Sequence, residues 1–188
     1  MRPTARIVVV ATLGAMALGA GCKRELADAP APRAGEHFKA SVLRVSDGDS
    51  FAVERDGKRL RVRLFGIDAP ERSQRFGNEA TKFLRERIDD KTVELEVRAV
   101  DRYGRAVAVV RVDGDKQPVN HALVAAGLAW WYRRYAPADK ALAALQREAR
   151  AKKRGVWSEA RPVSPWQFRR ARRHRMRFPR RRRRRSSE

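Results

Sequence analysis

The stretch that most constrains the fold is residues 61–71, which reads Arg-Val-Arg-Leu-Phe-Gly-Ile-Asp-Ala-Pro-Glu. Its first half predicts a strand, because Val62 and Leu64 alternate with arginines in a period of two. Gly66 then loosens the backbone, and Pro70 cannot continue a strand ladder. We therefore expect a strand with one apolar face that ends in a rigid turn.

The same stretch carries side chains that suit phosphodiester chemistry. Arginine offers a planar fork that matches a phosphate, and this strand contains Arg63. Asp68 and Glu71 follow on the turn, and carboxylates can hold a hard cation or take a proton from water. Taken alone, the stretch is also consistent with a strand and turn that carry ordinary surface charges.

The distribution of charge indicates a polyanionic partner. The 188 residues have room for one domain with tails, and they hold 44 Lys and Arg against 22 Asp and Glu. Residues 169–188 contain 12 arginines and one acidic residue, but the rest of the chain is basic as well. Charge alone does not choose among DNA, RNA and an anionic membrane.

Residues 1–22 have the build of a secretory signal, with two arginines followed by an apolar run too short for an ordinary membrane span. Ala20-Gly21-Cys22 resembles a bacterial lipoprotein processing site, so Cys22 could be lipidated and anchor the protein to a membrane. Gly19 stands where such sites usually have leucine, so ordinary cleavage near Ala17 remains an alternative. We expect an exported protein, either a cell-envelope lipoprotein or a periplasmic or secreted one.

The remaining chain divides into a flexible linker at residues 23–36, a folded domain at 37–168 and a disordered Arg-rich tail at 169–188. Apolar periodicity predicts five strands and three helices in the domain. The strands are expected at 38–45, 50–55, 59–66, 92–100 and 105–112, and the helices at 78–88, 118–126 and 137–155.

Two further stretches add charged groups of the same kind. Residues 47–50, Asp-Gly-Asp-Ser, place two carboxylates and a hydroxyl on a tight turn beside the strand of Arg63. Residues 101–105, Asp-Arg-Tyr-Gly-Arg, place another arginine at the start of a strand. Each is weak alone, because Asp-Gly-Asp is often just a turn and an arginine at a strand start is often solvated.

Together and in this order, these stretches resemble the staphylococcal nuclease family, also called thermonucleases. The resemblance covers about residues 38–168. The segments that carry it are Val-Ser-Asp-Gly-Asp-Ser at 45–50, the stretch 62–71, residues 101–105, Val-Asn-His-Ala-Leu-Val at 119–124 with Gly-Leu-Ala at 127–129, and Gly-Val-Trp at 155–157.

The resemblance implies an α+β fold that is mainly a β barrel, namely a five-stranded OB-fold barrel with three helices. It also implies a calcium-dependent endonuclease that cuts DNA and RNA at the P–O5′ bond and leaves 3′-phosphate ends. Residue by residue, it implies calcium ligands at Asp49, Asp68 and the backbone carbonyl of Ala69, phosphate-binding arginines at Arg63 and Arg105, and a general base at Glu71.

The chain departs from the family pattern in two places. The loop between Glu71 and Asn78 is shorter than in the namesake, which bears on rate and affinity. The family places tyrosines near the nucleotide, and here Tyr132 and Tyr135 are candidates for stacking on bases. Packing of these two rings against the last helix is the alternative.

Two other functions remain open from the sequence. The domain could be a non-catalytic OB-fold protein that binds nucleic acid. It could also be a lipid-anchored basic protein that adheres to envelope polyanions. Neither needs all the matched charged residues, so we expect the nuclease, acting as a monomer.

Overall fold

Five strands with alternating apolar residues close into a barrel. A computed structural model describes residues 26–177, so the expected signal sequence lies outside the described part of the chain. The barrel strands are β1 (His37–Asp47), β2 (Ser50–Arg55), β3 (Lys58–Leu64), β5 (Thr92–Val100) and β6 (Ala106–Val112). They follow the order β1-β2-β3-β6-β5, and β1 closes the circle by pairing with both β2 and β5. The predicted α+β fold with a five-stranded OB-type barrel is confirmed.

The alternation noted in the sequence fills the barrel. On β3 the buried positions are Leu60, Val62 and Leu64, while Arg61 and Arg63 point away from the core. β5 and β6 bury alternate aliphatic residues in the same way. Because successive side chains of a strand face opposite sides, the apolar face of β3 fixes Arg63 on its outer face.

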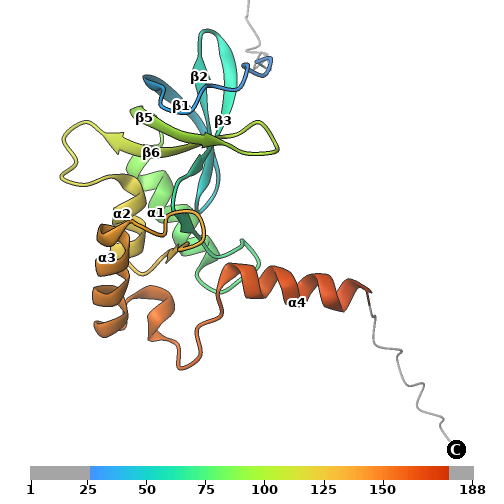
Figure 1. Ribbon diagram of the computed structural model, residues 1–188, viewed down its shortest axis with the longest axis vertical. Coiled ribbons are helices and arrows are strands. Elements are labelled where there is room, and N and C mark those ends of the chain that lie inside the picture. Colours follow the sequence, from blue (N-terminus) through green and yellow to red (C-terminus); the bar gives the residue numbers. More distant parts are fainter. Residues whose placement is uncertain (1–25, 178–188) are drawn as a thin grey trace, which may run out of the picture.

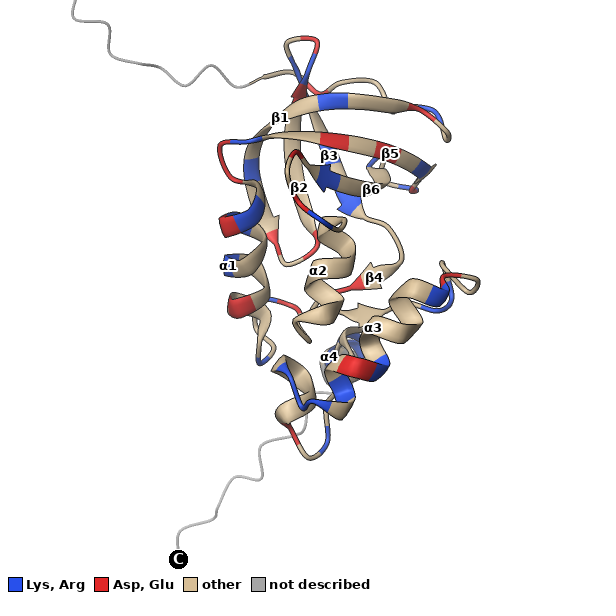
Figure 2. Ribbon diagram, turned by 90° about the vertical axis from the view of Figure 1, so that its left-hand side faces the viewer, with Lys and Arg blue, Asp and Glu red and all other residues tan. Residues whose placement is uncertain are grey.

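The helices gather at one end of the barrel (Figure 1). They are α1 (Gly77–Ile88), α2 (Val119–Ala125), α3 (Lys140–Ala151) and α4 (Pro165–Arg177), with a short 3-10 turn at Gly155–Ser158. α1 buries Ala80, Leu84 and Ile88, and charges of both signs lie along its outer side (Figure 2). Among residues 26–177, no helix is long and apolar enough to cross a membrane.

A short two-stranded sheet joins the barrel end to the helices. β4 (Ile67–Asp68) pairs with β7 (Trp130–Trp131), with Asp68 opposite Trp130. Buried Asn120 of α2 adds to this junction, because its side chain donates to the carbonyls of Phe65 and Ala108 and accepts from the Val110 amide. The segment that follows β3 is therefore held both by its pairing with β7 and by the side chain of Asn120.

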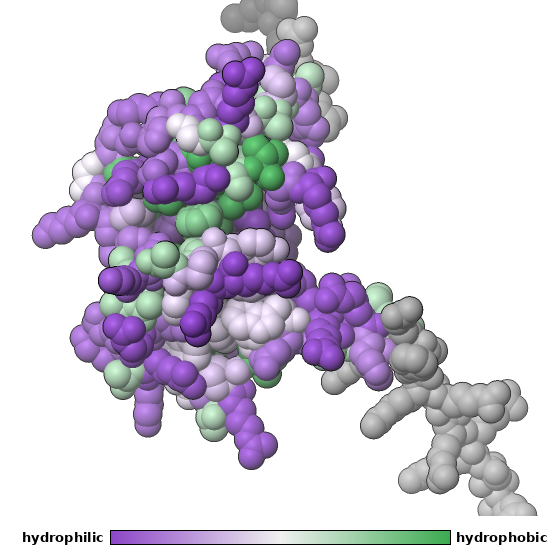
Figure 3. All heavy atoms as spheres, viewed as in Figure 1, coloured by the Kyte–Doolittle hydropathy of each residue, from purple (hydrophilic) through white to green (hydrophobic). Residues whose placement is uncertain are grey.

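The fourth helix was not predicted, and it corrects the boundary of the tail. The sequence analysis placed a disordered tail from residue 169, but α4 continues to Arg177. It projects from the body toward the C-terminus (Figure 1) and presents almost entirely hydrophilic residues (Figure 3). Its first turn is stabilised by Gln167, whose Oε1 accepts from both the amide and the hydroxyl of Ser164; the bond from the amide is one of the two bonds of a capping box.

The expected linker at residues 23–36 also needs correction in its described part. Ala29 N donates to the Arg59 carbonyl at 2.8 Å, and Arg59 N donates to the Ala27 carbonyl at 2.7 Å. Asp28 Oδ1 lies 2.9 Å from Arg59 Nε in an ion pair. This segment is therefore attached to β3, beyond the point where β6 pairs with it.

Candidate active site

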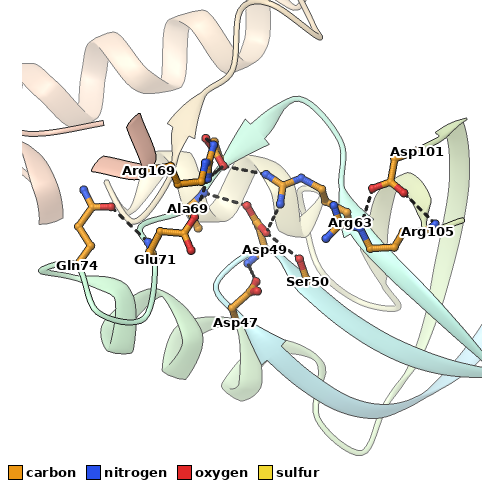
Figure 4. Close-up of polar contacts among 11 residues, drawn as sticks. Asp47, Asp49, Ser50, Arg63, Ala69, Glu71, Gln74, Asp101, Arg105 and Arg169 are labelled. Atoms are coloured by element: carbon orange, nitrogen blue, oxygen red, sulfur yellow. Dashed lines mark hydrogen bonds and ion pairs between the residues drawn. The ribbon is translucent and has the colours of Figure 1, made fainter. Parts of the chain in front are cut away.

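Two buried carboxylates from different segments meet on one guanidinium. Arg63 Nη1 donates to Asp49 Oδ1 at 2.9 Å, and Arg63 Nη2 donates to Asp68 Oδ1 at 2.8 Å (Figure 4). Asp49 is 4% exposed and Asp68 is fully buried. The end of β3, the turn between β1 and β2, and the short strand β4 each contribute one of these residues.

The turn that carries Asp49 is held by local contacts. Asp49 Oδ1 also accepts from the Ser50 hydroxyl at 2.9 Å, and Asp49 Oδ2 accepts from the Ala69 amide at 3.1 Å. A Cβ at Gly48 would lie 2.7 Å from the Ala80 Cβ, so glycine permits this turn to pack on α1. Asp49 and the backbone amide of Ala69 are thus in contact.

Burial shapes the electrostatics of this group. Burial, with a smaller contribution from the negative charge of Asp49, raises the pKa of Asp47 to about 6. Burial likewise raises the pKa of Asp68, against the opposing hydrogen bond from Arg169 and the charge of Arg63. Carboxylates crowded in this way gain from a nearby positive charge.

The donor set suits a hard cation. Asp49 and Asp68 supply carboxylate oxygens, which calcium prefers, and the Ala69 backbone contacts Asp49 through its amide. Over residues 26–177, no group of three or more Asp, Glu, His or Cys side chains forms a metal cluster. A cation here would therefore rely on two carboxylates, a backbone oxygen and water.

Glu71 is positioned by the short loop that leads to α1. Its amide donates to Gln74 Oε1 at 3.3 Å, and Gln74 N donates back to the Glu71 carbonyl at 2.7 Å. Gly77 packs against the same carbonyl, since a Cβ there would lie only 2.0 Å from it. The shortened loop thus fixes the Glu71 backbone against the start of α1.

Arg169, which joins Asp68 to Glu71, was not predicted from the sequence. Arg169 Nη2 donates to Asp68 Oδ2 at 2.6 Å, and Arg169 Nη1 donates to Glu71 Oε1 at 2.7 Å. Burial disfavours the charged form of Arg169 and so lowers its pKa. The carboxylates of Asp68 and Glu71 have the larger opposite effect, so the pKa of Arg169 is raised. The signal that could have found it is Ser164-Pro165-Trp166-Gln167, a capping box with proline at the first helical position, which predicts a helix there.

Arg105 lies next to β3, but its side chain is paired with Asp101. It immediately precedes β6, whose Ala106 pairs with Val62. Its Nε donates to Asp101 Oδ2 at 2.7 Å, to one side of the Asp49 and Asp68 group (Figure 4). Burial disfavours ionised Asp101, but the hydrogen bonds from Arg105 outweigh it and lower the pKa of Asp101.

The two tyrosine candidates differ in their surroundings. Tyr132 stacks on Trp166 of α4, with ring centroids 5.2 Å apart and planes 5° apart. Tyr135 packs edge-on against Tyr132 but is 62% exposed. Tyr132 therefore packs on α4, and not on the helix at 137–155 that the sequence suggested, while Tyr135 keeps a ring available to solvent.

Comparisons with known proteins find similarity to nucleases. Residues 61–159 match the family described as staphylococcal nuclease homologue. An uncharacterized endonuclease of Escherichia coli O157:H7 is 44% identical over 128 residues, which cover 68% of this chain and 82% of the relative. A micrococcal nuclease of Shigella flexneri is 37% identical over 142 residues, covering 71% and 82%. A probable staphylococcal-like nuclease of Oryza sativa subsp. japonica is 36% identical over 117 residues, covering 62% and 34%.

Proposed function

The chain belongs to the staphylococcal nuclease family, and from this premise we propose that it is a calcium-dependent endonuclease that hydrolyses DNA and RNA to leave 3′-phosphate ends. The observation that carries the proposal is the meeting of Asp49 and Asp68 on the fork of Arg63. A surface charge pattern without catalysis would not need two carboxylates buried at this point. Their burial costs free energy unless a cation or a guanidinium neutralises them.

Each residue has a definite task in this proposal. Asp49 and Asp68 would hold calcium together with the backbone carbonyl of Ala69, and calcium bound there would neutralise and polarise the phosphate. Arg63 and Arg105 donate N–H groups to the phosphate oxygens, where negative charge grows in the transition state. Glu71 orients a water molecule and accepts its proton.

The nucleic acid would approach over a strongly basic surface. The net charge of +22 favours a polyanion, and α4 continues this surface with exposed arginines at positions 170, 172 and 173. Tyr135 has an exposed ring on which a base can stack. These features support substrate binding but do not distinguish DNA from RNA.

The proposal is tested by cleavage of defined substrates. We expect the purified chain to cut single-stranded DNA and RNA when calcium is added, and to stop when a calcium chelator is in excess. The new ends should carry a 3′-phosphate, detected by resistance to labelling at the 3′ end until phosphatase is added. Binding of both substrates without any cleavage would support the non-catalytic OB-fold alternative instead.

A further inference from the structure

Arg169 binds both oxygens of the carboxylate that the proposed function gives to calcium. Asp68 Oδ2 accepts from Arg169 Nη2 at 2.6 Å, and Asp68 Oδ1 accepts from Arg169 Nη1 at 3.2 Å and from Arg63 Nη2 at 2.8 Å. Both oxygens of this fully buried side chain are therefore occupied by guanidinium groups. The same Nη1 of Arg169 also holds Glu71 Oε1.

The backbone that presents Arg169 is docked at one end and open at the other. Gln74 Nε2 donates to the Val163 carbonyl at 2.6 Å, and Trp166 stacks on Tyr132. Beyond Arg169 the helix side chains are exposed at residues 170–174. The arginine thus enters the site from a helix whose first turn is fastened and whose remainder extends into solvent (Figures 1 and 4).

A divalent cation and this guanidinium cannot bind Asp68 in the same way at the same time. The cation would have to share Asp68 with the guanidinium groups of Arg63 and Arg169, and positive groups at one buried carboxylate repel each other. One oxygen of Glu71, Oε1, is also paired with Arg169 at 2.7 Å. The described arrangement therefore disfavours a cation at Asp68.

We propose that Arg169 is a built-in counter-ion that closes the active site, so that calcium binds Asp68 only when α4 withdraws this side chain. The inference rests on the proposed function, because it takes Asp68 as a calcium ligand. It adds that the last helix, and not the carboxylates alone, sets how much calcium the protein requires. A purely structural ion pair would make the opposite prediction, since its loss would loosen the site and weaken calcium binding.

The test is calcium titration calorimetry on the full chain, with wild type, Arg169→Gln and Arg170→Gln compared at one pH and salt concentration. Arg170 is the matched control, because it is exposed on the same helix and its loss changes the net charge equally. We expect Arg169→Gln to bind calcium at least about tenfold more tightly, as the loss of a competing charge-assisted contact implies. Arg170→Gln should change the affinity by less than about twofold, as expected for a screened surface charge.

Two further variants separate the possible failures. Arg169→Lys keeps the charge but cannot bridge two carboxylates as a fork, so its affinity should fall between wild type and Arg169→Gln, and it replaces Arg169→Gln if that variant does not fold. Asp68→Asn should lose calcium binding. If the Arg169 variants bind calcium with unchanged or weaker affinity while Asp68→Asn loses binding, the proposed role of Arg169 is wrong and the proposed function is unaffected. Unaltered binding in Asp68→Asn overturns the metal assignment and the counter-ion together.

Discussion

Asp47 shows how a single residue near the site links stability to pH. Its pKa is raised to about 6 from 3.8, because burial disfavours its charge and Asp49 repels it. A carboxyl group with a raised pKa binds more protons in the folded state, so its contribution to stability is present below pH 4 and is lost as pH rises through about 6. The difference corresponds to about 3 kcal/mol, as an order of magnitude.

We therefore expect Asp47→Asn to be more stable than wild type at pH 7.5 and nearly equal to it at pH 4. Asparagine keeps the oxygen that accepts from the Asp49 amide, so the turn is preserved. Urea unfolding of both proteins in the presence of a chelator measures the difference. An equal difference in unfolding free energy between the two proteins at both pH values would show that Asp47 is not the titrating group.

At the residue scale, the sequence located the carboxylates and Arg63 but not their last partner. Asp49, Arg63 and Asp68 lie on short motifs whose backbone geometry is set locally, so matching the motifs was sufficient. Arg169 is 101 residues away from Asp68, and it lies among many arginines of similar local sequence. Only the docking of α4 distinguishes it from them, and docking is a property of the whole fold.

Among the elements, the junction between the site loop and α1 controls the position of Glu71. Gly77 opens α1, and an added methyl group would overlap the Glu71 carbonyl at 2.0 Å. We expect Gly77→Ala to cut nucleic acid about 10- to 100-fold more slowly, because displacement of a catalytic group by about 1 Å has this order of effect.

The control for that variant is Gly114→Ala, at a left-handed position with open space around it. It should lose some stability, roughly 1 kcal/mol from its positive φ, but retain the cleavage rate. Initial cleavage rates, measured where circular dichroism shows both proteins folded, make the comparison. Full activity in Gly77→Ala would mean that the loop backbone does not position Glu71.

The elements themselves were predictable to different degrees. Period-two alternation located all five barrel strands, since one face of each strand must be apolar to fill the barrel. β4 and β7 have two residues each, too few to show any period. α4 was missed because its arginines suggested disorder, whereas the helix is fixed by the Ser164 capping box and by the stacking of Trp166.

At the scale of the whole molecule, the charge of the chain predicts how it binds nucleic acid. Residues 178–188, which lie outside the described part, contain six consecutive arginines. Deleting them leaves Arg169 and α4 in place. If each arginine neutralises one phosphate, the slope of log K against log salt for duplex DNA should become shallower by up to about five.

Fluorescence anisotropy of labelled DNA in chelator, at several salt concentrations, measures this slope without cleavage. A tail that remains solvated, or that serves another polyanion, would leave the slope of the truncated protein equal to that of the full chain.

The central claim is that this site cleaves phosphodiester bonds with Glu71 as the base, and a single-turnover cleavage assay tests it most directly. Wild type and Glu71→Gln would be compared in excess over a labelled DNA strand, with saturating calcium and with DNA binding measured separately. We expect equal DNA binding and a cleavage rate about 10²- to 10³-fold lower in Glu71→Gln. Cleavage by Glu71→Gln at the wild-type rate would show that Glu71 is not the base.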